Sequence, residues 1–115
     1  MTMSDKSIRK KLLELKREAH EREIKKYLTE LSAQFEDWKK GKMSSGELSV
    51  HIHEYDKGPS KWMMGFYNDI DYDVSVARAV AIGLLAREEV PDEILEMIER
   101  QITYFKEQNK KPKKK

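Results

Sequence analysis

Two carboxylates and a histidine form the most chemical pattern in this sequence. Glu47, His51 and Glu54 are spaced by four and three residues, so on an α-helix their side chains share one face. A carboxylate–histidine set of this kind supplies half of the ligands of a di-metal site in a helical bundle. The other half requires a glutamate and a Glu-x-x-His motif on other helices, and the sequence contains no such motif. We therefore predict no cofactor and keep a carboxylate–histidine metal site as an alternative function.

The secondary structure of this stretch decides which residues can act together. In a strand, His51 and His53 would share a face and could bind one ion. Two patterns favour a helix, in which these rings point about 160° apart. Ser44 and Glu47 have the spacing of a capping box, in which each side chain binds a backbone amide of the other residue. The apolar residues that follow repeat at helical spacing: Leu48, Ile52 and Tyr55.

Arg78 is a single charge within the apolar stretch 74–86. A guanidinium in such surroundings needs a carboxylate or another anion to offset its lost hydration. Two interpretations follow, a structural ion pair with Glu54, Asp69 or another acid, or an anion-binding residue. We favour the ion pair, because a buried charge usually has a partner within the protein.

Other machinery of small enzymes is missing from the sequence. It contains no cysteine, and its five glycines are scattered, without a phosphate-binding loop or a nucleophile elbow. We therefore expect a non-catalytic protein. The lack of cysteine fits a reducing compartment, and residues 1–9 lack the apolar stretch of a signal peptide, so we expect a cytoplasmic location. The apolar stretch 74–86 is shorter than the about 18 residues that a membrane span requires.

The net charge of +2 is unevenly distributed along the chain. Residues 1–41 carry +3, residues 42–109 carry −6, and the lysine-rich residues 110–115 carry +5. Basic segments at both ends could bind RNA, DNA or another polyanion by releasing counterions, which we keep as a second alternative function. No recognisable nucleic-acid-binding module accompanies them.

The elements that would position these residues are all helical. The spacing of apolar residues, capping residues, glycines and prolines predicts an all-α fold, a bundle of four to five helices with a long N-terminal helix. We expect a single domain over 1–109, with an amphipathic arm over 1–23, the bundle over 24–109 and a disordered basic tail over 110–115. The predicted helices cover about 5–40, 44–57, 60–68, 74–87 and 91–108. Gly41 should end the first helix, Gly58-Pro59 should end the second, and Ser60 should cap the third. The fourth is apolar nearly all round, as expected of a central helix, and the fifth should bury Ile94, Leu95, Ile98, Ile102 and Phe105.

The first helix carries two apolar stripes that point about 160° apart. The first stripe consists of Ile8, Leu12, Leu15 and Ala19, and the second of Ile24, Leu28, Leu31, Phe35 and Trp38. A continuous helix would bury one stripe in the protein core and turn the other outward, whereas a kink near His20 would let both face inward. We favour the continuous helix, with its second stripe buried and its first stripe turned outward.

This geometry gives the main functional prediction. Ile8, Leu12, Leu15 and Ala19 form an interface with a helical protein partner or with a second copy of the chain, as in a homo-oligomer. We therefore expect a non-catalytic interaction protein that self-associates.

One segment resembles a family of short bacterial helical proteins without an assigned activity. The resemblance rests on Phe35–Lys39, Gly41, Ser44-Ser45, Glu47-Leu48, Ile52–Tyr55 and Gly58-Pro59, and extends weakly to Val76–Ala79 and Val90-Pro91. It implies that His53, Glu54, Tyr55 and Gly58 belong to a family pattern, and it implies no cofactor or partner. Because the helix turns His53 toward solvent, a role for these residues would be that of a binding surface.

Overall fold

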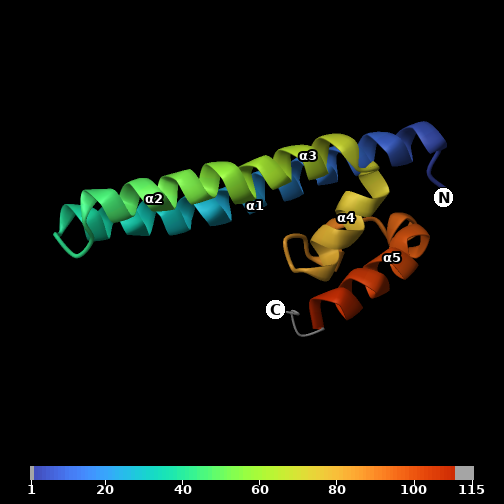
Figure 1. The fold of residues 1–115 in the computed structure, drawn as a ribbon. Coiled ribbons are helices and arrows are strands. Elements are labelled where there is room, and N and C mark those ends of the chain that lie inside the picture. Colours follow the sequence, from blue (N-terminus) through green and yellow to red (C-terminus); the bar gives the residue numbers. More distant parts are fainter. Residues whose placement is uncertain (1, 111–115) are drawn as a thin grey trace. The chain divides into compact units, whose positions relative to one another are not determined.

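The computed structural model describes residues 2–110, and these residues form helices and turns without a strand (Figure 1). The prediction of an all-α fold with a long N-terminal helix is therefore confirmed. The elements are α1 (Asp5–Lys39), α2 (Ser45–Tyr55), the π-helical turn η1 (Asp56–Ser60), α3 (Lys61–Asp69), α4 (Tyr72–Ala81), the 3-10 turn η2 (Arg87–Glu89) and α5 (Asp92–Lys110). Of the predicted tail, Lys110 ends α5, and residues 111–115 lie outside the described residues.

The chain divides into two compact units that share the helix α1. The first unit comprises Met1–Ala19 and Ile70–Lys115, and the second comprises His20–Asp69. The first twenty or so residues are thus part of a folded unit, whereas the sequence predicted an arm outside the bundle. No helix among residues 2–110 is long and apolar enough to cross a membrane.

The first unit is built around α4, which packs against α5 (Figure 1). Ser75, Val76, Ala77, Ala79 and Val80 of α4 are all buried, as predicted for a central helix. The helix is shorter than predicted, because Gly83 adopts a φ of +86°. The Leu84 amide then donates to the Ala79 carbonyl at 2.9 Å, which satisfies an end of the helix that would otherwise lack partners.

The helix α5 follows the predicted pattern closely. Pro91 stands directly before it, and the amide of Leu95 donates to the Pro91 carbonyl at 3.0 Å. Its inner face buries Ile94, Leu95, Ile98 and Ile102. Near its start, the Glu93 carboxylate accepts from the backbone amide of Met3 at 2.9 Å, which ties the beginning of α1 to α5 within the first unit.

The second unit is an antiparallel helical hairpin, with α2, η1 and α3 returning along the second half of α1 (Figure 1). Gly41, with a φ of +79°, closes the end of α1. The amides of Lys42 and Gly41 donate to the carbonyls of Asp37 and Trp38 at 2.8 and 3.1 Å, the pattern of a Schellman cap. The predicted capping box at Ser44 and Glu47 is present and starts α2.

Gly58 and Pro59 do not end the second helix, contrary to the prediction. The backbone instead makes the π-helical turn η1 across both residues and continues directly into α3. A proline removes one amide donor and crowds the carbonyl four residues earlier, and the wider π turn accommodates both effects. Ser60 is the last residue of η1 and does not cap a separate helix.

The first apolar stripe of α1 is buried and part of the second is exposed, which is the reverse of the prediction. The helix is continuous, but Leu12, Leu15 and Ala19 of the first stripe are only 7%, 5% and 0% exposed. In the second stripe, Leu28 and Trp38 are 46% and 38% exposed. The prediction that the first stripe is an outward-facing interface is therefore wrong for these three residues, and Ile8 is half-buried. The first unit also contains α4 and α5, whereas the second unit is a hairpin in which α2, η1 and α3 run beside α1.

Candidate functional site

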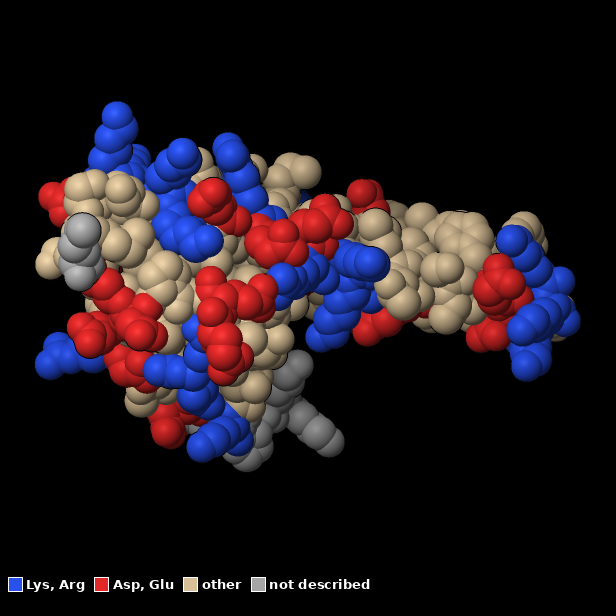
Figure 2. Space-filling model, turned by 180° about the vertical axis from the view of Figure 1, so that it is seen from behind, with Lys and Arg blue, Asp and Glu red and all other residues tan. Residues whose placement is uncertain are grey.

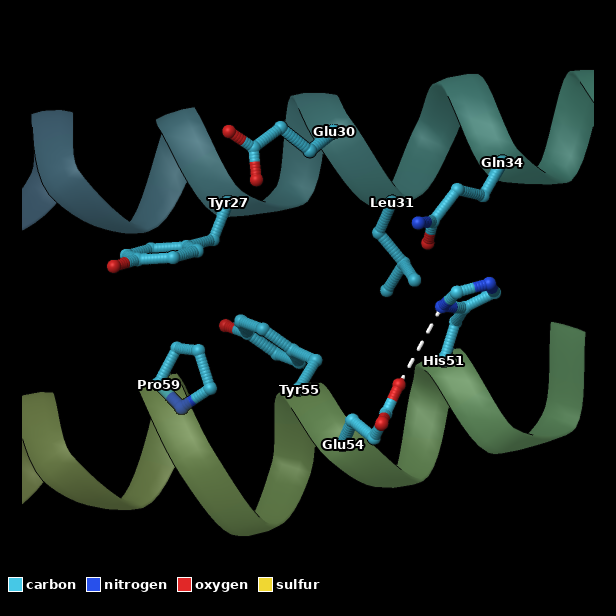
Figure 3. A pocket seen from close by; sticks show the side chains of 8 residues that line it. All are labelled: Tyr27, Glu30, Leu31, Gln34, His51, Glu54, Tyr55 and Pro59. Carbon is cyan, nitrogen blue, oxygen red and sulfur yellow. Dashed lines mark ion pairs between the residues drawn. The ribbon is translucent and has the colours of Figure 1, made fainter. Parts of the chain in front are cut away.

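A groove between α1 and α2 in the second unit gathers polar and aromatic side chains (Figure 3). Its lining residues are Tyr27, Glu30, Leu31 and Gln34 from α1, His51, Glu54 and Tyr55 from α2, and Pro59 from η1. Leu31 points between the helices, and Tyr27 and Tyr55 point toward each other from opposite sides. The hairpin geometry brings these residues together, because they are distant in sequence.

The contacts within the groove are loose. The Nδ1 atom of His51 lies 3.5 Å from Oε1 of Glu54, and these side chains are 36% and 65% exposed. The pair is an ion pair only while the imidazole is protonated, and water screens it at this exposure. The rings of Tyr27 and Tyr55 have centroids 6.4 Å apart at an interplanar angle of 44°. The groove contains about 200 Å³ of space.

Two of the three candidate metal ligands line this groove, and the third does not. His51 and Glu54 are adjacent, whereas Glu47 is one of the residues that cap the start of α2. Within residues 2–110, no group of three His, Asp or Glu side chains is placed to hold a metal ion. The groove as it stands offers a single imidazole–carboxylate pair, which is fewer ligands than protein metal sites use.

The residues of the resembling segment are only partly brought together. Glu54 and Tyr55 line the groove, whereas His53 and Gly58 are exposed and outside its lining. The exposure of His53 agrees with its expected direction on the helix. A binding role for all four residues stays a prediction.

The hairpin also exposes a weakly charged apolar surface. It includes Leu28 and Ile52, which are 46% and 39% exposed. On α1, a shallow groove is lined by Leu28, Leu31, Ser32, Phe35, Glu36 and Lys39. Glu30 is the only charged residue from 27 to 35. Figure 2 shows a matching stretch of surface without Lys, Arg, Asp or Glu before the charged end of the hairpin. We call Leu28, Leu31, Phe35, Trp38 and Ile52 the hairpin surface.

The second unit contains a buried polar cluster that the sequence did not predict. The hydroxyl of Tyr67 donates to Oε1 of Glu23 at 2.6 Å, and these residues are 0% and 4% exposed. The His20 ring stacks on Tyr67 with centroids 4.3 Å apart. The sequence offers little sign of this cluster, because residues 20–23 are all polar and separate the two apolar stripes of the first helix. Only the return of α3 along α1 places Tyr67 against it.

The charged groups of the first unit make mainly surface contacts. Arg78 is half-buried on α4, and its predicted carboxylate partner stays a prediction. Arg87 and Glu99 form an exposed ion pair, with a nitrogen and an oxygen 2.7 Å apart. Its hydrogen bond raises the pKa of Arg87 and lowers the pKa of Glu99. The Tyr72 ring lies below Lys16 Nζ and Arg9 Cζ, at 5.0 and 5.7 Å from its centroid, so part of the basic charge of α1 is directed at an aromatic ring.

Comparisons with known proteins assign no family to this geometry. No family model, no curated protein and no solved structure matches the chain.

Proposed function

We propose that the chain is a non-catalytic interaction protein that self-associates through the hairpin surface. The proposal rests on how little apolar surface the second unit buries by itself. Of the sixteen buried apolar residues within 2–110, only Leu48, Met63 and Tyr67 belong to the second unit. Two packed helices cannot enclose a core, so their remaining apolar side chains stay exposed to water.

A second copy of the hairpin is the occupant that fits this surface best. Two antiparallel hairpins that face each other form a four-helix bundle, in which the apolar residues of all four helices are enclosed. A twofold arrangement lets the same surface serve both copies. Residues 20–69 hold eight basic and nine acidic residues, so two hairpins repel each other little. As part of the same proposal, the lack of cysteine suits a reducing, cytoplasmic setting.

Analytical ultracentrifugation tests the proposal directly. The wild-type chain should sediment as a dimer at micromolar concentration, and Leu28→Glu should weaken the dimer at least about tenfold, since a charge would be buried at the interface. Met97→Glu is the matched control, because Met97 is a 54% exposed residue of α5 in the first unit.

Three outcomes would contradict the proposal. They are a wild-type chain that stays monomeric up to high micromolar concentration, a Leu28→Glu dimer as tight as wild type, or an equal loss in Met97→Glu. Circular dichroism on each variant shows that its helical content is retained. A monomeric wild-type chain that captures another protein through Leu28 would instead identify a different occupant.

A further inference from the structure

We infer that the groove between α1 and α2 binds the side chain of an arginine from a protein partner. This inference does not rest on self-association, because seven of the eight residues that line the groove lie outside the hairpin surface, and only Leu31 belongs to both. The lining includes two glutamates and neither lysine nor arginine, so its charge favours a cation. The His51 imidazole adds positive charge only when it is protonated.

The two tyrosines give the groove a flat aromatic character. The rings of Tyr27 and Tyr55 face one another across it with centroids 6.4 Å apart (Figure 3). An aromatic face attracts a cation through its quadrupole. The ring of Tyr27 already lies near a cation from its own helix, because Lys26 Nζ is 5.9 Å from the ring centroid. A guanidinium can stack on such a ring by its plane and donate hydrogen bonds from its edge at the same time.

Acceptors for the guanidinium edge lie on both walls. The carboxylate of Glu54 stands on α2, and the amide of Gln34 points from α1 toward His51 on the other side (Figure 3). A carboxylate accepts two parallel hydrogen bonds from one guanidinium, which an ammonium group cannot match. The chemistry therefore favours arginine over lysine.

The size of the groove favours a side chain of a partner over a free metabolite. It contains about 200 Å³ of space and is open to solvent. Pockets that enclose small molecules usually hold roughly 300–1,000 Å³. One side chain fits the smaller volume, and the partner backbone can then lie across the open side.

A peptide titration followed by nuclear magnetic resonance tests this inference. The probes are three short glycine–serine peptides with a central arginine, lysine or citrulline, and free guanidinium chloride. The arginine peptide should shift the ring signals of Tyr27 and Tyr55 in a saturable way. The lysine peptide should bind about fivefold more weakly because it lacks the planar fork, and neutral citrulline should bind negligibly.

Variants assign the binding to individual residues. Glu54→Gln should weaken arginine binding about tenfold through loss of the charged acceptor. Lys26→Gln should strengthen binding about twofold or more, because it removes a competing cation from Tyr27. Lys25→Gln is its control, with the same charge change on an adjacent exposed position. Tyr55→Phe should retain binding and Tyr55→Leu should lose it, since the ring and not the hydroxyl attracts the cation.

Several results would overturn the inference. If the citrulline and arginine peptides bound equally well, the groove would not recognise a positive charge. If Lys25→Gln and Lys26→Gln had equal effects, the bound cation would not contact the Tyr27 ring. Binding of free guanidinium as tight as that of the peptide would replace the protein partner by a small organic cation. The titration is repeated in Leu28→Glu, where unchanged binding separates this groove from the hairpin surface.

Discussion

Polar side chains of the second unit lie in two contrasting environments. Glu23 and Tyr67 are almost fully buried and share a hydrogen bond of 2.6 Å, whereas the side chains of His51 and Glu54 are 36% and 65% exposed and lie 3.5 Å apart. Burial makes the first pair energetically important, because a buried polar group that loses its partner is not rescued by water. Exposure makes the second pair available to a ligand. The buried pair therefore supports the fold, whereas the more exposed pair is a candidate for binding.

Tyr67→Phe tests the importance of the buried hydrogen bond. The substitution removes only the hydroxyl and should lower the free energy of unfolding by about 1–3 kcal/mol. Urea denaturation followed by circular dichroism measures the change. Tyr104→Phe is the control, because Tyr104 is 57% exposed on α5 and should change stability by less than about 0.5 kcal/mol. A Tyr67→Phe chain as stable as wild type would show that this hydrogen bond contributes little to stability.

The helix α1 serves different surroundings at its two ends. Residues up to Ala19 belong to the first unit, where Leu12, Leu15 and Ala19 are buried, and later residues form one side of the hairpin. A continuous helix can do this because its apolar face changes direction near His20, so each stripe meets its own environment without a kink. The helix therefore carries a structural stripe and a partly exposed stripe in a single element.

Leu12→Ala distinguishes these two roles. Leu12 is 7% exposed, so the truncation leaves a cavity and should lower the free energy of unfolding by about 2–5 kcal/mol. The matched substitution Leu28→Ala removes the same atoms from a 46% exposed position and should cost less than about 1 kcal/mol in the monomer. Chemical denaturation at low protein concentration provides both values. Equal losses in the two variants would contradict the assignment of core and surface.

Across the whole molecule, the two units differ in core and in charge. The first contains most of the buried apolar residues within 2–110 and its residues carry a net +3, whereas the second contains three of them and carries −1. A well-filled core makes the first unit less dependent on a partner. The second unit is close to neutral and poorly filled, which is the composition expected of a segment completed by association.

Self-association predicts that thermal stability depends on protein concentration. If folding and dimer formation are coupled, mass action stabilises the folded chain as its concentration rises. The unfolding temperature of wild type should therefore increase by several degrees between about 1 and 100 μM. The unfolding temperature of Leu28→Glu should stay constant over this range. Differential scanning fluorimetry or circular dichroism checks both, and a constant wild-type value would argue for a monomer.

The sequence by itself determined the features that depend on neighbouring residues. It predicted the capping box at Ser44 and Glu47, the glycine after α1 and the buried stripe of α5, because each depends on spacing within one element. Gly58-Pro59 was misread as a stop, since a π turn is an alternative that local propensity does not reveal. Only the tertiary structure decided which stripe of α1 is covered, where Tyr67 meets Glu23, and that the Tyr27 and Tyr55 rings face each other. These features join residues from different helices, so their energies depend on packing partners that periodicity alone does not identify.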